Sequence, residues 1–287
     1  MMCPVCHSET RPGLRPWHVR CSSCSYEGST LTPTIQDRPD TGDIDEIARE
    51  RGLGYLREAN FKRLSDRLGQ IIRAAGRPRV LDVGCSHGWF IEANRSRYDV
   101  LGIEPDVAVA ASASARGLPV RNGYFPDALS ADEQFDAIIF NDVLEHIPDV
   151  GGILRACFDH LADDGVVVVN APSSNGVLYK VAAMLARAGI NGPFDRLWQL
   201  GLPSPHVHYF DQATIQKLAH DHGFVMESAM SLPSVLLSGL YDRIHCSGQV
   251  SAAKAAALTI GVAISYPLIQ ISPPDIEVWF LRKTRGA

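Results

Sequence analysis

VLDVGCSHGWF, residues 80–90, decides the fold, because an apolar strand runs into an acid, a glycine turn and the start of a helix. Glycine turns of this kind often hold phosphate on a helix N-terminus. Asp82 ends the strand, however, and its negative charge would repel a pyrophosphate. The turn reads Gly84, Ser86 and Gly88, a poor match to the Gly-x-Gly-x-x-Gly of dinucleotide sites. The stretch therefore predicts a ligand that tolerates or prefers a neighbouring acid.

Strands and helices alternate on both sides of this stretch. We expect strands at 79–83, 99–103, 119–121, 135–140, 166–170, 224–230 and 275–283. Short apolar runs separated by helical patterns predict an α/β fold with a mostly parallel sheet covered on both faces. Ligands of such sheets bind at the carboxyl ends of the strands, where the motifs discussed below fall.

Glu104 closes the second strand, 22 residues after Asp82. A carboxylate at this place can accept hydrogen bonds from both hydroxyls of a ribose. A ligand with a ribose, a positive centre and no phosphate fits both acids, and S-adenosylmethionine has these features. As alternatives, Asp82 could be a helix N-cap and Glu104 a solvated charge at the end of a strand.

Four stretches together resemble class I S-adenosylmethionine-dependent methyltransferases: VLDVGCSHGWF, VLGIEPD, FDAIIFNDVLEHIPD and LADDGVVVVNAPS. The resemblance covers about 79–224 and is to the broad branch that modifies quinones and sugars. It implies a Rossmann-like, seven-stranded, mostly parallel sheet whose last strand runs antiparallel.

The resemblance also implies roles for individual residues. It places Gly84 and Cys85 at the methionine tail of the cofactor, and glycine is usual where Ser86 stands. Phe125 corresponds to an adenine contact, although a plain core role is the alternative. The cofactor-binding residues expected from the strand ends and the resemblance are Asp82, Gly84, Cys85, Ser86, Gly88, Glu104, Tyr124, Phe125 and Asn141.

Two histidine-containing stretches are candidates for catalysis. His146, in NDVLEHIPDV, is the expected base for a hydroxyl acceptor, and Glu145 could orient it. His206 and His208, in SPHVHYFD, lie two residues apart and would point to one side of an extended segment over the same site. The alternative is that Glu145 and His146 only cap and pack the following helix.

A second divalent ion is another alternative at this place. Asp142, Glu145 and His146 would share one face if helical, and His206 or His208 could complete an oxygen and nitrogen shell. This set is similar to the Glu-x-x-Glu-His and distal histidine of small-RNA 2′-O-methyltransferases, with Asp142 in place of the first glutamate.

Two Cys-x-x-Cys pairs near the N-terminus predict a structural zinc site. Cys3, Cys6, Cys21 and Cys24 have the spacing of a closed tetrahedral thiolate shell. About 26 residues cannot bury enough apolar surface to fold without such a metal. We therefore expect a zinc-ribbon-like module at 1–31, a linker at 32–44, and a methyltransferase domain at 45–287 with lid insertions at about 173–205 and 233–274.

Composition restricts the partners. A net charge of −5 and only five lysines speak against nucleic acid as the main partner. We expect a small-molecule acceptor, methylated on a hydroxyl of a sugar, quinone, polyketide or lipid-linked metabolite. A ribosomal or other RNA methyltransferase is the alternative, since a four-cysteine module before this fold resembles one such type; a zinc-module scaffold with an inactive domain is a third.

The segment 255–272 is uncharged over 18 residues. We expect a buried or lid helix, with shallow contact to a membrane or lipid carrier as the alternative. No basic region followed by an apolar run begins the sequence, so a cytoplasmic location is expected.

Overall fold

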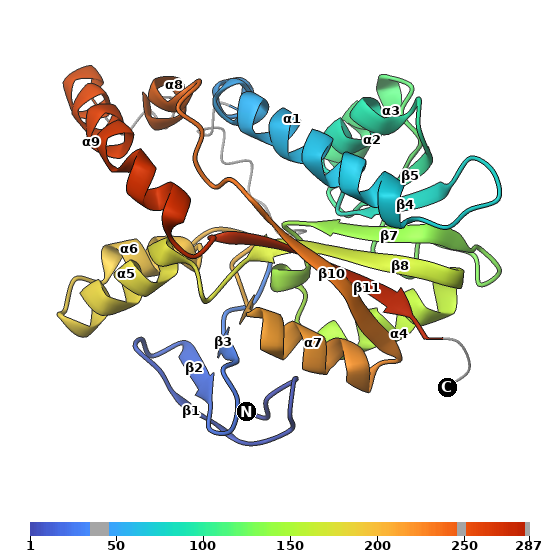
Figure 1. Cartoon of the computed structure of the whole chain (residues 1–287), viewed down its shortest axis with the longest axis horizontal. Helices are drawn as coiled ribbons and strands as arrows, with labels where there is room; N and C mark the ends of the chain where they lie inside the picture. Colours follow the sequence, from blue (N-terminus) through green and yellow to red (C-terminus); the bar gives the residue numbers. More distant parts are fainter. Residues whose placement is uncertain (35–45, 246–250, 285–287) are drawn as a thin grey trace.

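The computed structural model describes residues 1–34, 46–245 and 251–284 of the chain, and its centre is one mixed sheet (Figure 1). The seven strands have the order β10-β11-β8-β7-β4-β5-β6. They are β4 (Arg79–Val83), β5 (Asp99–Glu104), β6 (Val120–Asn122), β7 (Phe135–Asn141), β8 (Leu161–Pro172), β10 (Phe224–Leu232) and β11 (Ile276–Lys283). β11 pairs antiparallel with both neighbours, whereas β4 to β8 pair in parallel. The predicted seven-stranded α/β sheet is confirmed.

Helices cover the two faces of the sheet. In Figure 1, α1, α2 and α3 lie above it, and α4 and α7 lie below it. The helices are α1 (Glu46–Ile71), α2 (Trp89–Asn94), α3 (Val107–Ala115), α4 (Val150–His160), α5 (Val177–Arg187), α6 (Gly192–Leu197), α7 (Gln212–Asp221), α8 (Leu240–His245) and α9 (Ala252–Ile271), with a 3₁₀ turn at Leu144–His146.

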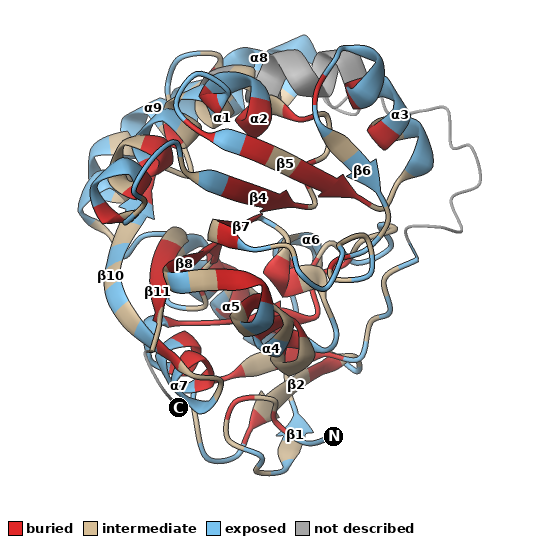
Figure 2. Ribbon diagram, turned by 90° about the vertical axis from the view of Figure 1, so that its right-hand side faces the viewer, coloured by how far each residue is buried: buried red, intermediate tan, exposed pale blue. Residues whose placement is uncertain are grey.

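Alternate strand residues enter two different cores. Val166 and Val168 pack with α1 and α2, whereas Val167 and Val169 pack with α4 and α7. Since both faces are covered, the middle residues of the central strands are apolar and buried, and Figure 2 shows this burial. This packing fixes the carboxyl ends of β4, β5 and β7 side by side.

A second, smaller sheet joins the N-terminal residues to the rest of the chain. β1 (Thr10–Pro12), β2 (His18–Cys21) and β3 (Glu27–Ser29) pair antiparallel, and β9 (His208–Tyr209) adds the fourth strand. The expected linker at 32–44 falls largely on 35–45, which lie outside the described residues.

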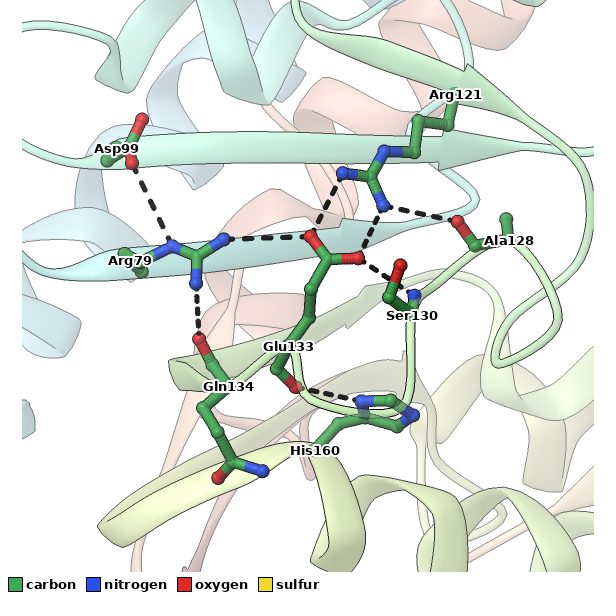
Figure 3. Close-up of polar contacts among 8 residues, drawn as sticks. All are labelled: Arg79, Asp99, Arg121, Ala128, Ser130, Glu133, Gln134 and His160. Carbon is green, nitrogen blue, oxygen red and sulfur yellow. Dashed lines mark hydrogen bonds and ion pairs between the residues drawn. The ribbon is translucent and has the colours of Figure 1, made fainter.

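A charged network holds the loop between β6 and β7 (Figure 3). Arg121 donates two hydrogen bonds to Glu133, at 2.6 and 2.9 Å, and a third to the Ala128 carbonyl. The Ser130 amide donates to the same carboxylate at 2.9 Å. The arginine hydrogen bond holds the pKa of Glu133 down at about 2. These contacts therefore fix the part of the loop that follows Tyr124 to the sheet.

The two expected insertions differ in their placement. The segment 173–205 contains α5 and α6, and 233–274 contains α8 and α9. Of the described residues of α9 only Ala255 is buried, so the expectation of a buried helix is wrong. α9 projects away from the sheet on the same side of the molecule as α5 and α6, at the left of Figure 1.

Candidate active site

The turn after β4 has a left-handed backbone at three positions. Gly84, Ser86 and Gly88 have φ of 68°, 50° and 75°. A Cβ on Gly84 would lie 2.7 Å from Val143 Cγ2, so glycine is required there for space as well as conformation. Ser86 adopts the same left-handed conformation with a side chain, which explains why glycine is usual at this place.

Glu104 and Asp82 lie at the ends of adjacent parallel strands. The Glu104 carboxylate accepts hydrogen bonds from the Ser86 amide at 2.8 Å and from the Asp106 amide at 2.9 Å. These bonds connect the turn after β4 to the turn after β5. Asp82 is 2% exposed and accepts from Asn141 Nδ2 at 3.3 Å. Glu104 is buried, so it is not a solvated charge at the end of a strand. Asp82 is not the N-cap of the following helix, because Gly88 is the N-cap of α2.

A cavity of about 420 Å³ lies beside Glu104. Tyr124 and Phe125 line it from the loop after β6. Phe125 is buried, with its ring edge-on to Phe140 at 6.1 Å, whereas Tyr124 is 43% exposed. Apolar aromatic walls next to a carboxylate match the two halves of a nucleoside.

A second cavity, of about 460 Å³, lies on the other side of Gly84 and His146, which line both. Asp82, Cys85 and Asn141 line this one. Its chemistry fits a cationic amino-acid tail, because Asp82 is a buried acid and Asn141 Oδ1 has no hydrogen-bond partner among the described residues. Gly88 lines neither cavity, and shapes the turn instead.

The backbone donors of the turn are already in use. Both the Gly84 and Cys85 amides donate to the Ile103 carbonyl, at 2.8 and 3.0 Å. The side chain of Cys85 is buried against Gly102. The turn therefore brings backbone near the cavity without leaving these two amides free to bind a ligand.

His146 has one ring nitrogen fixed by the protein. Its Nδ1 donates to the Pro205 carbonyl at 3.0 Å, which leaves Nε2 as the unprotonated nitrogen. Burial lowers the pKa of His146, so the ring is neutral near pH 7. The ring of His206 packs edge-on against it with centroids 4.7 Å apart, and both line the larger cavity.

Glu145 is the buried acid of this cluster. It is 1% exposed and neither carboxylate oxygen has a hydrogen-bond partner among the described residues. Burial, and then the nearby Asp142, raise its pKa well above the usual range. Glu145, His146 and His206 each place one ligand atom within 4.8 Å of the others.

Two expectations about this cluster require correction. Asp142 has φ of 55°, and the 3₁₀ turn begins only at Leu144, so Asp142 does not share a helical face with Glu145 and His146. His208 does not line either cavity: it binds Tyr26 through Nδ1 at 2.6 Å and the Ile147 carbonyl through Nε2 at 2.9 Å.

The four N-terminal cysteines converge. The Sγ atoms of Cys3 and Cys24 are 3.7 Å apart and those of Cys6 and Cys21 are 3.3 Å apart. Tetrahedral zinc with Zn–S bonds of about 2.3 Å requires sulfurs about 3.8 Å apart, so the donor set fits this metal. Backbone amides also point at the sulfurs of Cys3 and Cys21, as expected around thiolates.

Sequence reasoning missed Arg57 and Gln199, which both line the larger cavity. Arg57 reaches it from α1 and lies over the Trp89 ring at 4.3 Å, and Gln199 reaches it from the 173–205 segment. Gln199 Nε2 donates to His206 Nε2 at 2.9 Å. Their positions in helical or irregular stretches carry no motif, and only the contact with His206 identifies Gln199.

The sheet, the left-handed turn and the paired cavities define the class I S-adenosylmethionine-dependent methyltransferase fold. A methyltransferase domain family model matches residues 53–229, more than half of the chain. The chain belongs to this family.

Curated relatives agree. The ubiquinone biosynthesis O-methyltransferase of Psychrobacter arcticus is 32% identical over 164 residues, covering 54% of this chain and 62% of that protein. The protein of the same name from Pseudomonas fluorescens is 34% identical over 158 residues, covering 49% and 68%. The chain thus spans only part of the length of the relatives that it matches.

Solved structures share the fold at low identity. A SAM-dependent methyltransferase from Archaeoglobus fulgidus superposes with a TM-score of 0.53 at 16% identity, covering 83% of this chain and all of that one. Phosphoethanolamine N-methyltransferase 2 of Haemonchus contortus, in complex with S-adenosyl-L-methionine, gives 0.57 at 16%, covering 87% and 59%.

Proposed function

We propose that this protein transfers a methyl group from S-adenosylmethionine to a hydroxyl of a small-molecule acceptor of the quinol or catechol class. The relatives named ubiquinone biosynthesis O-methyltransferases support the hydroxyl and the acceptor class. The observation that carries the proposal is the pair of cavities that meet at Gly84 and His146. The RNA alternative has no comparable support, since these relatives' names point to a small molecule.

Each of the two cavities would bind a different part of the cofactor. Glu104, Tyr124 and Phe125 would hold the nucleoside of the cofactor, and Asp82 and Asn141 would bind its charged tail. When bound there, the cofactor supplies an electrophilic methyl group. The protein's own contribution is to hold the acceptor in line and to exclude water from the site.

His146 is the proposed base. An acceptor hydroxyl in the larger cavity loses its proton to Nε2, because Nδ1 already carries the proton that it donates to Pro205. Burial has lowered the pKa of His146, so near pH 7 the ring is neutral and Nε2 is available to accept a proton. His206, which packs on the ring of His146, limits its rotation.

A divalent ion at Glu145, His146 and His206 is the alternative to a His146 base, because a bound ion would take the Nε2 lone pair that otherwise accepts the proton. A buried carboxylate that has no hydrogen-bond donor within the described part of the chain is stabilised by a cation, and oxygen with imidazole nitrogen suits a divalent transition metal. Such an ion would lower the pKa of an acceptor hydroxyl bound to it. Asp142 is left out of this set.

The N-terminal module is proposed to hold one structural zinc ion, and the protein to work in the cytoplasm. Paired cysteines of metal-ligand spacing persist as thiolates in a reducing compartment. Thr32 and Pro33, which directly follow the module, line the nucleoside cavity. The division into module, linker and domain is part of this proposal.

A lipid surface is the proposed partner of α9. This helix is long and apolar enough to cross a membrane, yet only 6% of its apolar window is buried. The two insertions carry five basic residues against two acidic ones, while the whole chain has a net charge of −5. A cationic, apolar side of the molecule suits an anionic bilayer that contains a lipid-linked acceptor.

A methyl-transfer assay tests the proposal. Protein and methyl-labelled S-adenosylmethionine are incubated with 3,4-dihydroxybenzoate and with a short-chain ubiquinol precursor in detergent. We expect a labelled methyl ether from at least one catechol and a loss of about 10²–10⁴-fold in His146→Asn. Labelled product on nitrogen or carbon only, or full activity in His146→Asn, would contradict the proposal.

A further inference from the structure

The segment that carries His206 is held to the 3₁₀ turn at Leu144–His146, here called the catalytic turn, by one backbone and one side-chain hydrogen bond. The Val207 amide donates to the Glu145 carbonyl at 2.8 Å, and His146 Nδ1 donates to the Pro205 carbonyl at 3.0 Å. The segment therefore determines which nitrogen of His146 is free. β9, which follows, has only two residues, and strands this short do not hold their place unaided.

The N-terminal module supplies the support on the opposite side of this segment. β3 pairs with β9, and the Ser29 amide donates to the Val207 carbonyl at 3.0 Å. Ser29 Oγ donates to the His206 carbonyl at 2.8 Å, a contact that is buried. The catalytic turn, the His206 segment and the module thus form three consecutive layers of backbone.

His208 adds a side-chain connection through the same layers. Its Nε2 donates to the Ile147 carbonyl at 2.9 Å, so Nδ1 accepts from the Tyr26 hydroxyl at 2.6 Å. His208 therefore joins the module to the catalytic turn.

Both module residues that make these contacts follow the fourth cysteine closely. Tyr26 is two residues after Cys24, and Ser29 ends the strand that begins at Glu27. Tyr26, Cys3 and Cys21 lie in the same buried cluster as Leu81 of β4. Because so small a module depends on its metal to fold, the position of Tyr26 and Ser29 depends on the metal-binding cysteines.

We infer that the cysteine module is a positioning element of the methyl-transfer site, acting through Tyr26 and Ser29 on the segment that holds His206 and His146. The turn after β4 and the side chain of Glu104 belong to the main sheet and not to the module. Cofactor binding therefore depends on the module much less than the position of His146 does. The role of His146 rests on the proposed function, but the positioning itself can be measured without turnover.

Hydrogen–deuterium exchange of the full chain is the test. Zinc content is measured first, and Cys24→Ser is compared with the wild-type protein. We expect peptides covering 205–210 and 144–148 to exchange at least about tenfold faster in the variant, while those covering 89–94 and 107–115, whose buried side chains lie in the other core, keep their rates. Unchanged exchange at 205–210 in zinc-depleted protein would overturn the inference, as would equal acceleration at 89–94 and 107–115.

Milder variants keep the test valid if Cys24→Ser fails to fold. Ser29→Ala removes the hydroxyl that binds the His206 carbonyl, and Ser29→Thr restores it. Tyr26→Phe is matched by Tyr98→Phe, which removes a buried hydroxyl bound to the Ser65 carbonyl elsewhere in the protein. We expect faster exchange at 205–210, by about tenfold, in Ser29→Ala and Tyr26→Phe only.

Two further readouts separate positioning from simple loss of stability. In Tyr26→Phe, the affinity for S-adenosylhomocysteine should stay within about threefold of wild type, whereas nitrogen-15 shifts of the His146 ring should move toward a mixture of tautomers. A pure Nδ1-protonated ring in this variant would count against the inference. Absence of methyl transfer by the wild-type protein would contradict the proposed function and leave the exchange result standing.

Discussion

Asp82, the proposed binding residue for the charged tail of the cofactor, is the residue whose ionisation should respond most directly to ligand binding. Burial raises its pKa to about 7, the Asn141 hydrogen bond opposes this shift, and the charge of Glu104 adds to it. A cation that binds beside Asp82 favours the ionised carboxylate and therefore lowers this pKa. Below about pH 7 the free protein carries a proton on Asp82 that a cationic ligand displaces.

Proton release on binding follows from this shift. At about pH 6, S-adenosylmethionine should release close to one proton on binding, and at about pH 8.5 almost none, because Asp82 is then already ionised. Calorimetry in buffers of different ionisation enthalpy measures this number. Asp82→Asn is the variant that removes the group. The same proton release in Asp82→Asn as in wild type would assign the effect to another acid.

Glu145 provides a test of the proposed divalent ion. Manganese added to protein with an intact zinc module should bind at one further site, detected by paramagnetic resonance. Glu145→Gln should weaken this binding by at least about tenfold, because a charged ligand is lost. Asp142→Asn serves as the comparison, since Asp142 is outside the ligand cluster. Equal manganese binding by wild type and Glu145→Gln would exclude this site.

The sequence predicted the positions of those site residues that lie at the ends of strands. Asp82 is the last residue but one of β4 and Glu104 ends the adjacent β5, so strand prediction alone placed them together. Arg57 and Gln199 reach the site from a helix face and an irregular segment, for which no spacing rule exists. The partners of His208 were unpredictable because Tyr26 is 182 residues away in the chain. Side-chain direction there depends on tertiary contacts.

At the scale of elements, strands were predicted better than helix environments. β4 was predicted at its observed bounds, and β8 proved longer than expected because its first residues extend back to Leu161. Apolar composition identified α9 as a helix but not its surroundings. Burial depends on what packs against an element, and in the described part of the chain α8 is the main neighbour of α9.

Exposure makes α9 the element to test for lipid binding. Ile264 is 75% exposed, and replacing it with glutamate puts a charge into the proposed bilayer contact. Ile264→Glu should bind vesicles of phosphatidylglycerol and phosphatidylcholine at least about tenfold more weakly than wild type in co-sedimentation.

Val107→Glu is the matched control for this experiment. Val107 is 69% exposed at the start of α3, away from α9, so the same change should leave vesicle binding intact. Both variants should melt near the wild-type temperature, because exposed substitutions change stability by only about 0.5 kcal/mol. Equal vesicle binding by all three proteins would remove the lipid surface from the account.

For the whole molecule, two sheets meet at one site. The large sheet presents Glu104 and Asp82 at its carboxyl edge, and the small sheet incorporates β9 next to His206. The predicted fold class followed from patterns within the large sheet. The pairing of the small sheet with β9 could not be predicted in this way, because β9 is two residues long and has no periodicity.

Titration calorimetry with S-adenosylhomocysteine tests the assignment of the nucleoside site most directly. The wild-type chain should bind about one molecule and show no comparable affinity for NAD, whose pyrophosphate would face Asp82. Glu104→Gln should weaken binding by at least about tenfold, since a hydrogen bond to a charged group is lost, whereas Glu92→Gln, on the exposed surface of α2, should not. Undiminished binding by Glu104→Gln, or preferential binding of NAD by the wild-type protein, would contradict the account.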